Sequence, residues 1–249
     1  MLEIHDVSKS FGGIQAVSHC TLELKDYPIT GLIGPNGSGK TTLFNLITGS
    51  TPLDQGKVFF EGRRIDGHLP HEVAWHGILR TFQLTRIFPK MTVLENMLVA
   101  PLQQTGENFW SLWFRGKRIQ KEEKKIFEKA LGLIELVGLS HLKNQFSENL
   151  SYGQQKLLEL VRVMMADPKM VLLDEPTAGI NPSMIQKVME LILKMKSMGK
   201  AFFIIEHNMD VVIELCDWVF VLDNGEKIAE GKPKEISNNP RVIEAYLGV

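Results

Sequence analysis

A glycine-rich loop near the N-terminus ends in a lysine and a threonine, a combination typical of phosphate binding. The loop and the residue after it are Gly34, Pro35, Asn36, Gly37, Ser38, Gly39, Lys40, Thr41 and Thr42. Glycines let backbone N–H groups turn towards phosphate oxygens, Lys40 can reach the β- and γ-phosphates, and the Thr41 hydroxyl can hold Mg²⁺. Thr42 is a candidate contact of the α-phosphate. A chance glycine-rich turn is the alternative, but here an apolar run precedes the loop and a helical stretch follows it.

Two carboxylates, Asp174 and Glu175, follow the apolar run Met170–Leu173. In proteins with this type of loop, an aspartate at the carboxyl end of a strand holds Mg²⁺. Glu175 is then placed to polarise an attacking water as a general base. The alternative is a pair of solvated acids in a loop. The phosphate loop upstream favours the metal-binding and catalytic roles over this alternative.

The pattern of apolar residues predicts the elements that position these groups. Strands are expected within residues 20–24, 29–33, 58–60, 78–82, 171–173, 201–205 and 218–222, and helices within residues 41–48, 182–198, 208–215 and 240–247. Residues 92–166 have helical character, and their apolar residues at helical spacing include Ile126, Phe127, Ala130, Leu131, Ile134 and Val137. Asn224-Gly225 is a hairpin turn signal. Strands that alternate with helices predict a mostly parallel sheet covered on both faces.

The composition is that of an ordinary globular protein without a strong charge. Of 249 residues, 44% are hydrophobic and 23% charged, and the formal net charge is −1. These values exclude a disordered chain and give no positive field for non-specific nucleic-acid binding. We expect no signal peptide and no span of the ~20 apolar residues that cross a bilayer. Cys20 and Cys216 form no disulfide framework or metal motif, which favours a reducing compartment.

A segment upstream of Asp174 resembles the signature of the ATP-binding cassette, or ABC, family. It reads Leu150-Ser151-Tyr152-Gly153-Gln154-Gln155, where the family commonly has Leu-Ser-Gly-Gly-Gln. The resemblance implies that Ser151, Gly153 and Gln154 face the ATP of a second subunit from the start of a helix. The alternative is that Ser151 only caps this helix, and one side chain can do both.

The resemblance assigns three further residues. Gln83 resembles the glutamine that senses Mg²⁺ and water, Phe11 the aromatic residue that stacks on adenine, and His207 the histidine that contacts the γ-phosphate. A lone histidine is more often structural, but His207 follows a strand end downstream of Glu175. The implied cofactors are ATP and Mg²⁺, with Thr41, Gln83 and Asp174 at the metal.

The sequence departs from the family pattern at two positions. Tyr152 stands where the signature has its first glycine, so its size could alter subunit docking. Asn181, in the segment Ala178–Asn181, stands where aspartate is common in the family. The detailed cross-subunit contacts that the resemblance implies for this segment are therefore not carried over to Asn181.

Three segments resemble the ATP-binding subunits of branched-chain amino-acid importers. They are residues 80–96, 176–182 and 239–248. The resemblance implies transmembrane permease subunits and a second, identical or related ATP-binding subunit as partners, and indirectly a solute-binding protein. It places the chain peripherally at the cytoplasmic face of the cell membrane. No physical feature of these segments identifies the cargo.

Two further segments are candidate partner surfaces. Residues 84–91 are expected to receive a short helix of a membrane subunit, because Gln83 lies at one end and the helical block begins at the other. The alternative is that their apolar side chains pack within that block. Residues 109–114 hold four aromatic side chains followed by basic residues, which fits either a subdomain core or a surface near a membrane or partner.

We therefore expect one ABC ATP-binding domain over residues 1–249. It is an α/β P-loop fold with a mostly parallel sheet, an antiparallel β subdomain and an inserted helical subdomain at approximately residues 84–166. The expected function is an ATPase that powers solute import, and the alternatives within transport are an exporter or a lipid-linked transporter. A soluble ABC ATPase acting on DNA or ribosomes is less favoured, because such proteins usually carry two cassettes or a long coiled coil and this sequence shows neither. A P-loop kinase or GTPase is also less favoured, because such proteins lack the segment at Ser151.

Overall fold

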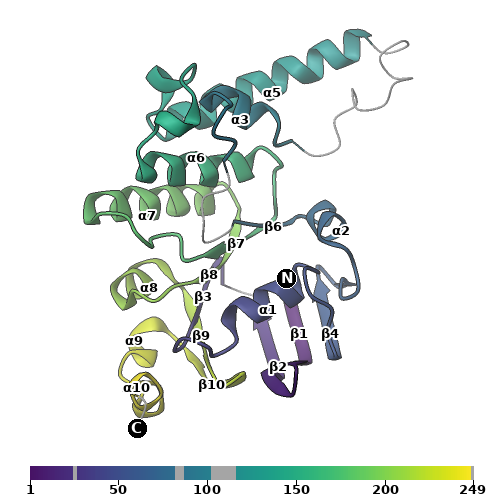
Figure 1. The fold of residues 1–249 in the computed structure, drawn as a ribbon, viewed down its shortest axis with the longest axis vertical. Helices are drawn as coiled ribbons and strands as arrows, with labels where there is room; N and C mark the ends of the chain where they lie inside the picture. The colour runs from purple at the N-terminus through teal and green to yellow at the C-terminus, as the bar shows by residue number, and fades with distance from the viewer. Residues whose placement is uncertain (25–26, 82–86, 102–115, 248–249) are drawn as a thin grey trace. The chain divides into compact units, whose positions relative to one another are not determined.

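The computed structural model describes residues 1–24, 27–81, 87–101 and 116–247 (Figure 1). The strands are β1 (Leu2–Phe11), β2 (Ile14–Leu24), β3 (Ile29–Ile33), β4 (Gln55–Phe60), β5 (Arg63–Arg64), β6 (Ile78–Arg80), β7 (Met170–Asp174), β8 (Ala201–Ile205), β9 (Trp218–Asp223) and β10 (Glu226–Gly231). The helices are α1 (Lys40–Ile47), α2 (Pro70–Trp75), α3 (Val93–Leu98), α5 (Gly116–Leu136), α6 (Tyr152–Met164), α7 (Pro182–Ser197), α8 (Met209–Leu215), α9 (Pro233–Ile236) and α10 (Pro240–Leu247), with 3₁₀ turns η2 (Ser140–Leu142) and η3 (Ser147–Asn149).

The chain divides into two compact units. The sheet unit comprises Met1–Gln83, Lys169–Ala178 and Gln186–Val249, and the helical unit comprises Leu84–Pro168 and Gly179–Ile185. None of the helices in the described part of the chain is long and apolar enough to cross a membrane.

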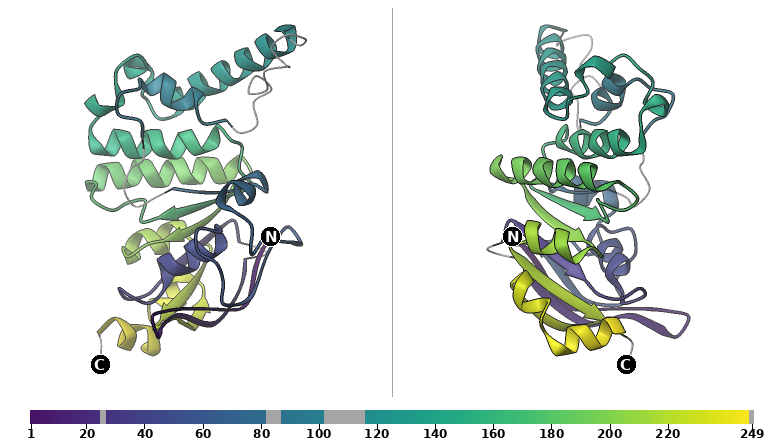
Figure 2. Two further views of the ribbon diagram at one scale, coloured as in Figure 1. Left: turned by 45° about the vertical axis from the view of Figure 1, so that its right-hand side comes forward. Right: turned by 90° about the vertical axis from the view of Figure 1, so that its left-hand side faces the viewer.

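The sheet unit contains a mostly parallel sheet and an antiparallel sheet, so the expected α/β fold is confirmed. The six-stranded sheet has the order β10-β9-β3-β8-β7-β6, in which only β10 is antiparallel to its neighbour. The four-stranded sheet has the order β2-β1-β4-β5 and is antiparallel throughout. Figure 2 shows both sheets from two further sides. The carboxyl ends of the parallel strands therefore meet at one edge, where ligands of such sheets bind.

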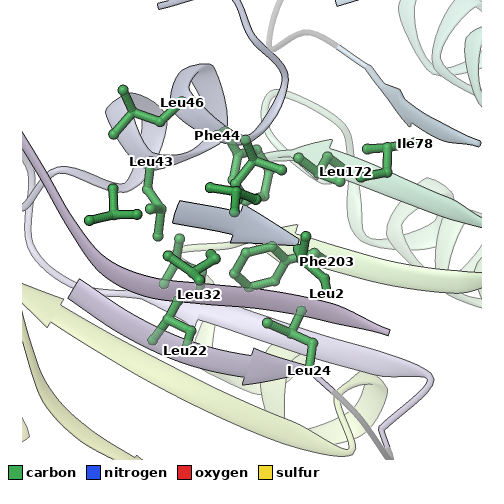
Figure 3. Packing of buried hydrophobic residues seen from close by; sticks show 14 of the residues in the cluster. Leu2, Leu22, Leu24, Leu32, Leu43, Phe44, Leu46, Ile78, Leu172 and Phe203 are labelled. Atoms are coloured by element: carbon green, nitrogen blue, oxygen red, sulfur yellow. The ribbon is translucent and has the colours of Figure 1, made fainter. Parts of the chain in front are cut away.

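The core of the sheet unit lies between α1 and the two sheets. Leu43 and Phe44 of α1 pack with Leu22 and Leu24 of β2 and with Phe203 of β8, all buried (Figure 3). The strand expected within residues 20–24 is confirmed as part of β2, in which Cys20, Leu22 and Leu24 are buried while the residues between them are exposed. This packing fixes α1, and with it the loop that precedes α1.

In the described residues of the helical unit, α3, α5 and α6 contact one another. Asn96 of α3 is fully buried and holds the preceding turn. Its side-chain amide donates to the carbonyl oxygens of Phe88 at 3.0 Å and Met91 at 3.3 Å, and its Oδ1 accepts from the Phe88 N–H at 2.8 Å. A buried, satisfied amide of this kind makes the turn rigid.

Several expected boundaries differ from the structure. Within the described part of residues 92–166, helix is confined to α3, α5 and α6, and the 3₁₀ turns η2 and η3 lie between α5 and α6. Phe127, placed on the apolar stripe of its helix, has 43% of its surface exposed. The short helices α2 and α9 were not expected, and each begins with a proline, which suits the first turn of a helix. The hairpin at Asn224-Gly225 is confirmed, and both residues have positive φ.

Candidate nucleotide site

The glycine-rich loop joins the end of β3 to the start of α1, as expected. Gly34 and Gly39 have φ of 149° and 97°, in the region that favours glycine. A Cβ atom on Gly34 would collide with the carbonyl oxygen of Leu222, and one on Gly39 with that of Ala16. These two glycines therefore allow the loop to pass close to neighbouring backbone, which a larger residue would prevent.

The start of α1 is suited to bind an anion. Its N-cap is Gly39, no side chain caps it, and its first turn contains no acidic residue. The first N–H groups of a helix have no intrahelical partner, and the helix dipole makes this end positive. The loop and helix start therefore fit the phosphates of a nucleotide.

Lys40 lies folded back over the loop. Its Nζ donates to the carbonyl oxygens of Gly34 at 2.8 Å and Pro35 at 2.7 Å, and to Ser38 Oγ at 3.3 Å. Burial lowers the pKa of the Lys40 amine, and the carboxylates of Glu175 and Asp174 act in the opposite direction. The loop thus concentrates a buried positive charge beside two carboxylates, and phosphate oxygens could replace the carbonyl acceptors.

Asp174 is the last residue of β7, and its carboxylate forms an ion pair with Arg80. Arg80, the last residue of β6, donates from Nη2 to Asp174 Oδ2 at 2.6 Å and from Nη1 to Asn45 Oδ1 at 2.6 Å. The side chains of Arg80 and Asp174 are both buried. The Asp174 carboxylate and the Thr41 hydroxyl are hard oxygen donors of the kind Mg²⁺ prefers, so these residue types fit the metal.

Glu175 and His207 meet at the ends of two neighbouring parallel strands. Asp174 of β7 pairs with Ile205 of β8, and His207 Nε2 lies 3.0 Å from Glu175 Oε1. Glu175 has φ of 49°, a left-handed conformation that is unfavourable for a residue with a side chain. Strain of this kind concentrates at functional sites, and here it accompanies a carboxylate paired with an imidazole.

Phe11 is the last residue of β1, and 49% of its surface is exposed. The Nζ atom of Lys9 lies 5.4 Å from the centre of its ring. The ring is therefore accessible for stacking by a flat base.

In the helical unit, Ser151 caps α6. Gln154 N–H donates to Ser151 Oγ at 3.3 Å, and Ser151 N–H donates to Gln154 Oε1 at 2.9 Å, which together form a capping box. The capping role considered for Ser151 is confirmed, and the side chain of Gln154 is engaged in the same cap. A Cβ atom on Gly153 would lie 2.7 Å from the flexible side chain of Met184.

The two departures from the family pattern have local structural roles. Asn181 Oδ1 accepts from the Met184 N–H at 2.9 Å and so caps α7. Tyr152 is exposed, and its ring lies beside Gly179, where a Cβ atom would be 3.4 Å from the ring edge. Gln83 and the aromatic segment 109–114 lie outside the described residues.

The site also contains residues that the sequence did not reveal. Arg80 binds Asp174, Glu206 lies buried next to His207, and the Tyr246 hydroxyl of α10 accepts from the Gly34 N–H at 2.9 Å. Glu206 and His207 directly follow β8, just as Asp174 ends β7 and Glu175 follows it. This parallel between the two strand ends could have drawn attention to Glu206. No local pattern marks Arg80 or Tyr246, because their partners are far away in the sequence.

Comparison with known proteins agrees with this geometry. The family described as ABC transporter matches residues 17–178, and a second, described as branched-chain amino acid ATP-binding cassette transporter, matches residues 226–249. LivG of Archaeoglobus fulgidus, a probable branched-chain amino acid transport ATP-binding protein, is 45% identical over 100% of this chain and 95% of its own length. BraF of Pseudomonas aeruginosa, a high-affinity branched-chain amino acid transport ATP-binding protein, is 38% identical over 100% of this chain and 98% of its own length. A crystal structure of an ABC transporter's ATP-binding cassette in its ADP conformation has a TM-score of 0.85, with 39% identity over 100% of this chain and 99% of that one. The chain therefore belongs to the ABC transporter family, as one of its ATP-binding, ATP-hydrolysing proteins.

Proposed function

We propose that this ABC protein hydrolyses ATP to power the import of branched-chain amino acids by a membrane transporter. The observation that carries the hydrolytic role is the Glu175–His207 pair at 3.0 Å, beside the buried Lys40. The solute class is supported by the two relatives that span this chain and by the match of residues 226–249. The chain would act at the cytoplasmic face of the membrane, bound to permease subunits.

Each residue of the site has a proposed role. The residues proposed to bind the nucleotide are Phe11, Gly34, Pro35, Asn36, Gly37, Ser38, Gly39, Lys40, Thr41, Thr42 and Asp174. When bound, Mg²⁺ would neutralise developing phosphate charge, and Thr41, Gln83 and Asp174 would hold it. Glu175 takes a proton from the attacking water as general base, and the ring of His207 orients Glu175 and the γ-phosphate.

A second ATP-binding subunit is proposed to complete this site. The start of α6 presents the Ser151 hydroxyl and backbone N–H groups, a suitable environment for a γ-phosphate. In a closed pair, Ser151, Gly153 and Gln154 of one subunit would contact the ATP that Lys40 of the other subunit holds. ATP can favour closure only if it binds the closed pair more tightly than the open one.

Replacing Lys40 with alanine is expected to weaken ATP binding about ten- to a hundredfold. The reason is that a charge-assisted hydrogen bond to phosphate contributes roughly 1.5–3 kcal/mol. The measurement is titration with a fluorescent ATP analogue. Lys187→Ala, the same change at an exposed position of α7, is the matched control and should leave affinity unaltered. Unchanged affinity in Lys40→Ala would contradict the proposed phosphate site.

The turn before α3 is proposed to bind a permease subunit. Phe88 has 49% of its surface exposed, the Arg162 guanidinium lies 5.4 Å above its ring, and Asn96 fixes its backbone. An exposed aromatic ring on a rigid backbone, next to an arginine, is typical of an interface anchor. The exposure argues against packing of Phe88 in a core; Leu84–Arg86, also part of this proposed surface, lie outside the described residues.

Phe88→Asp is expected to cost about 2 kcal/mol or more of binding to the permease while the isolated subunit keeps its melting temperature and basal ATPase. The measurement is a pull-down with the permease beside a thermal melt. Phe127→Asp makes the same change at a similarly exposed ring of α5 and should assemble normally. Normal assembly of Phe88→Asp, or early melting, would contradict the proposed interface.

Uptake of labelled leucine tests the solute class. Cells that lack this subunit are complemented with the wild-type chain or with Glu175→Gln, and only the wild type should restore uptake of leucine, isoleucine and valine. If the wild-type chain restores no uptake of these solutes, branched-chain amino-acid import is contradicted, and if Glu175→Gln restores it as well as the wild type, the role of Glu175 is contradicted.

A further inference from the structure

Glu206 is a buried carboxylate between β8 and His207, with only 4% of its surface exposed. Burying a carboxylate is costly unless hydrogen bonds satisfy its oxygens. In the described residues, it accepts bonds from two separate loops. Its Oε1 accepts from the N–H of Thr177 at 3.1 Å and from the Thr177 hydroxyl. Its Oε2 accepts from the N–H of His207 at 3.0 Å and of Asn208 at 3.4 Å.

We propose that Glu206 is a positioning residue for ATP hydrolysis. Its carboxylate joins the loop that contains Glu175 to the loop that contains His207, and so holds these two side chains within hydrogen-bond distance. This proposal rests on the roles proposed above for Glu175 and His207.

The backbone around Glu175 explains why such a link matters. The Glu175 N–H donates to the carbonyl oxygen of Ile205 at 2.9 Å, and the Ala178 N–H donates to that of Glu175 at 3.1 Å. The first bond ties Glu175 to the end of β8, and the second closes a tight turn that begins at Glu175, whose φ is a left-handed 49°. A strained conformation persists only where its surroundings enforce it. Glu206 holds the Thr177 end of this turn and, through its other oxygen, the start of the His207 loop.

Both carboxylate oxygens of Glu206 are used as acceptors. An ionised carboxylate has two acceptor oxygens and no donor, whereas glutamine has one acceptor oxygen and an NH₂ group that donates. In Glu206→Gln, this NH₂ group must therefore face the donors of either Thr177 or His207. The backbone N–H groups on that side then lose their acceptor, although the volume of the side chain is almost unchanged.

Glu206→Gln is expected to lower kcat about ten- to a hundredfold, since small misplacements of catalytic groups have effects of this size, with little change in the KM for ATP. In ¹⁵N-labelled, nucleotide-free protein, the amide resonances of Thr177 and His207 should shift, because they lose a charged acceptor. Glu214→Gln, the same change at an exposed position of α8, should alter neither. Full kcat with unmoved amides in Glu206→Gln would overturn the proposal, as would a loss of kcat that only follows a loss of folded protein.

A second pair of variants tests the link without changing its charge. Thr177→Val removes one donor to Glu206 and should lower kcat several-fold, whereas Thr177→Ser keeps the hydroxyl and should retain most of the activity. Equal kcat in the two variants would overturn the link. Glu175→Gln and His207→Ala are measured in the same assay. If they hydrolyse ATP normally, the proposed roles fail; if they are slow while Glu206→Gln is normal, only the positioning by Glu206 fails.

Discussion

Replacing Glu175 with glutamine is expected to slow ATP hydrolysis by about 10²–10⁴, the usual contribution of general acid–base catalysis. Glutamine has nearly the same shape but cannot take a proton from the attacking water. ATP binding should persist, because Lys40 and the start of α1, rather than Glu175, are proposed to hold the phosphates. The unhydrolysed ATP should then keep two subunits together. The measurements are single-turnover hydrolysis and the sedimentation coefficient with and without ATP.

Glu190→Gln is the matched control for this prediction. It makes the same chemical change at an exposed position of α7, and its turnover should equal that of the wild type. Near-normal turnover in Glu175→Gln would remove Glu175 from the role of general base and leave its contact with His207 as a structural one.

Ser151→Arg is expected to abolish ATP-dependent pairing of subunits and cooperative hydrolysis, while a single subunit still binds ATP. The added cation would occupy the space where a γ-phosphate and the backbone of α6 must meet. A fluorescent ATP analogue measures binding by the single subunit, and sedimentation measures pairing. Loss of ATP binding by the single subunit would show that Ser151 belongs to the chain's own site.

Two variants separate this effect from the loss of the helix cap. Removal of an N-cap side chain costs about 0.5–2 kcal/mol of stability, and Ser151 has this structural role. Ser151→Asp keeps a good cap but brings a negative charge towards the phosphate, so pairing should still fail. Ser151→Thr keeps both the cap and the hydroxyl, so pairing should survive.

The sequence allowed much of the fold to be predicted because the strands have simple patterns. The run 201–205 was predicted with the bounds of β8, and the hairpin at Asn224-Gly225 follows from residues that tolerate positive φ. The loop at Gly34 and the acids at Asp174 were recognisable because each lies next to a short buried strand. Local sequence therefore indicated where the ends of the parallel strands lie.

Contacts between distant residues could not be predicted in this way. Arg80 was expected only as part of a strand, yet its guanidinium binds Asp174, 94 positions away. Glu206 was not singled out, because its significance depends on Thr177, 29 positions away. Phe127 was expected only to share the helical spacing of its apolar neighbours, and 43% of its surface is exposed. Periodicity indicates which residues share a face, but it does not show what covers that face.

The measurement that tests the shared site most directly is ATP hydrolysis by a mixture of Lys40→Ala and Ser151→Arg subunits. Each variant alone should be inactive under conditions in which the wild-type chain hydrolyses ATP cooperatively, at an ATP concentration too low for Lys40→Ala to bind. In a mixed pair, one site combines Lys40 of the Ser151→Arg subunit with Ser151 of the Lys40→Ala subunit, and this site is intact. We therefore predict that mixing restores hydrolysis. A mixture no more active than its two components would show that each chain completes its own site. It would contradict an ATP site shared between two subunits.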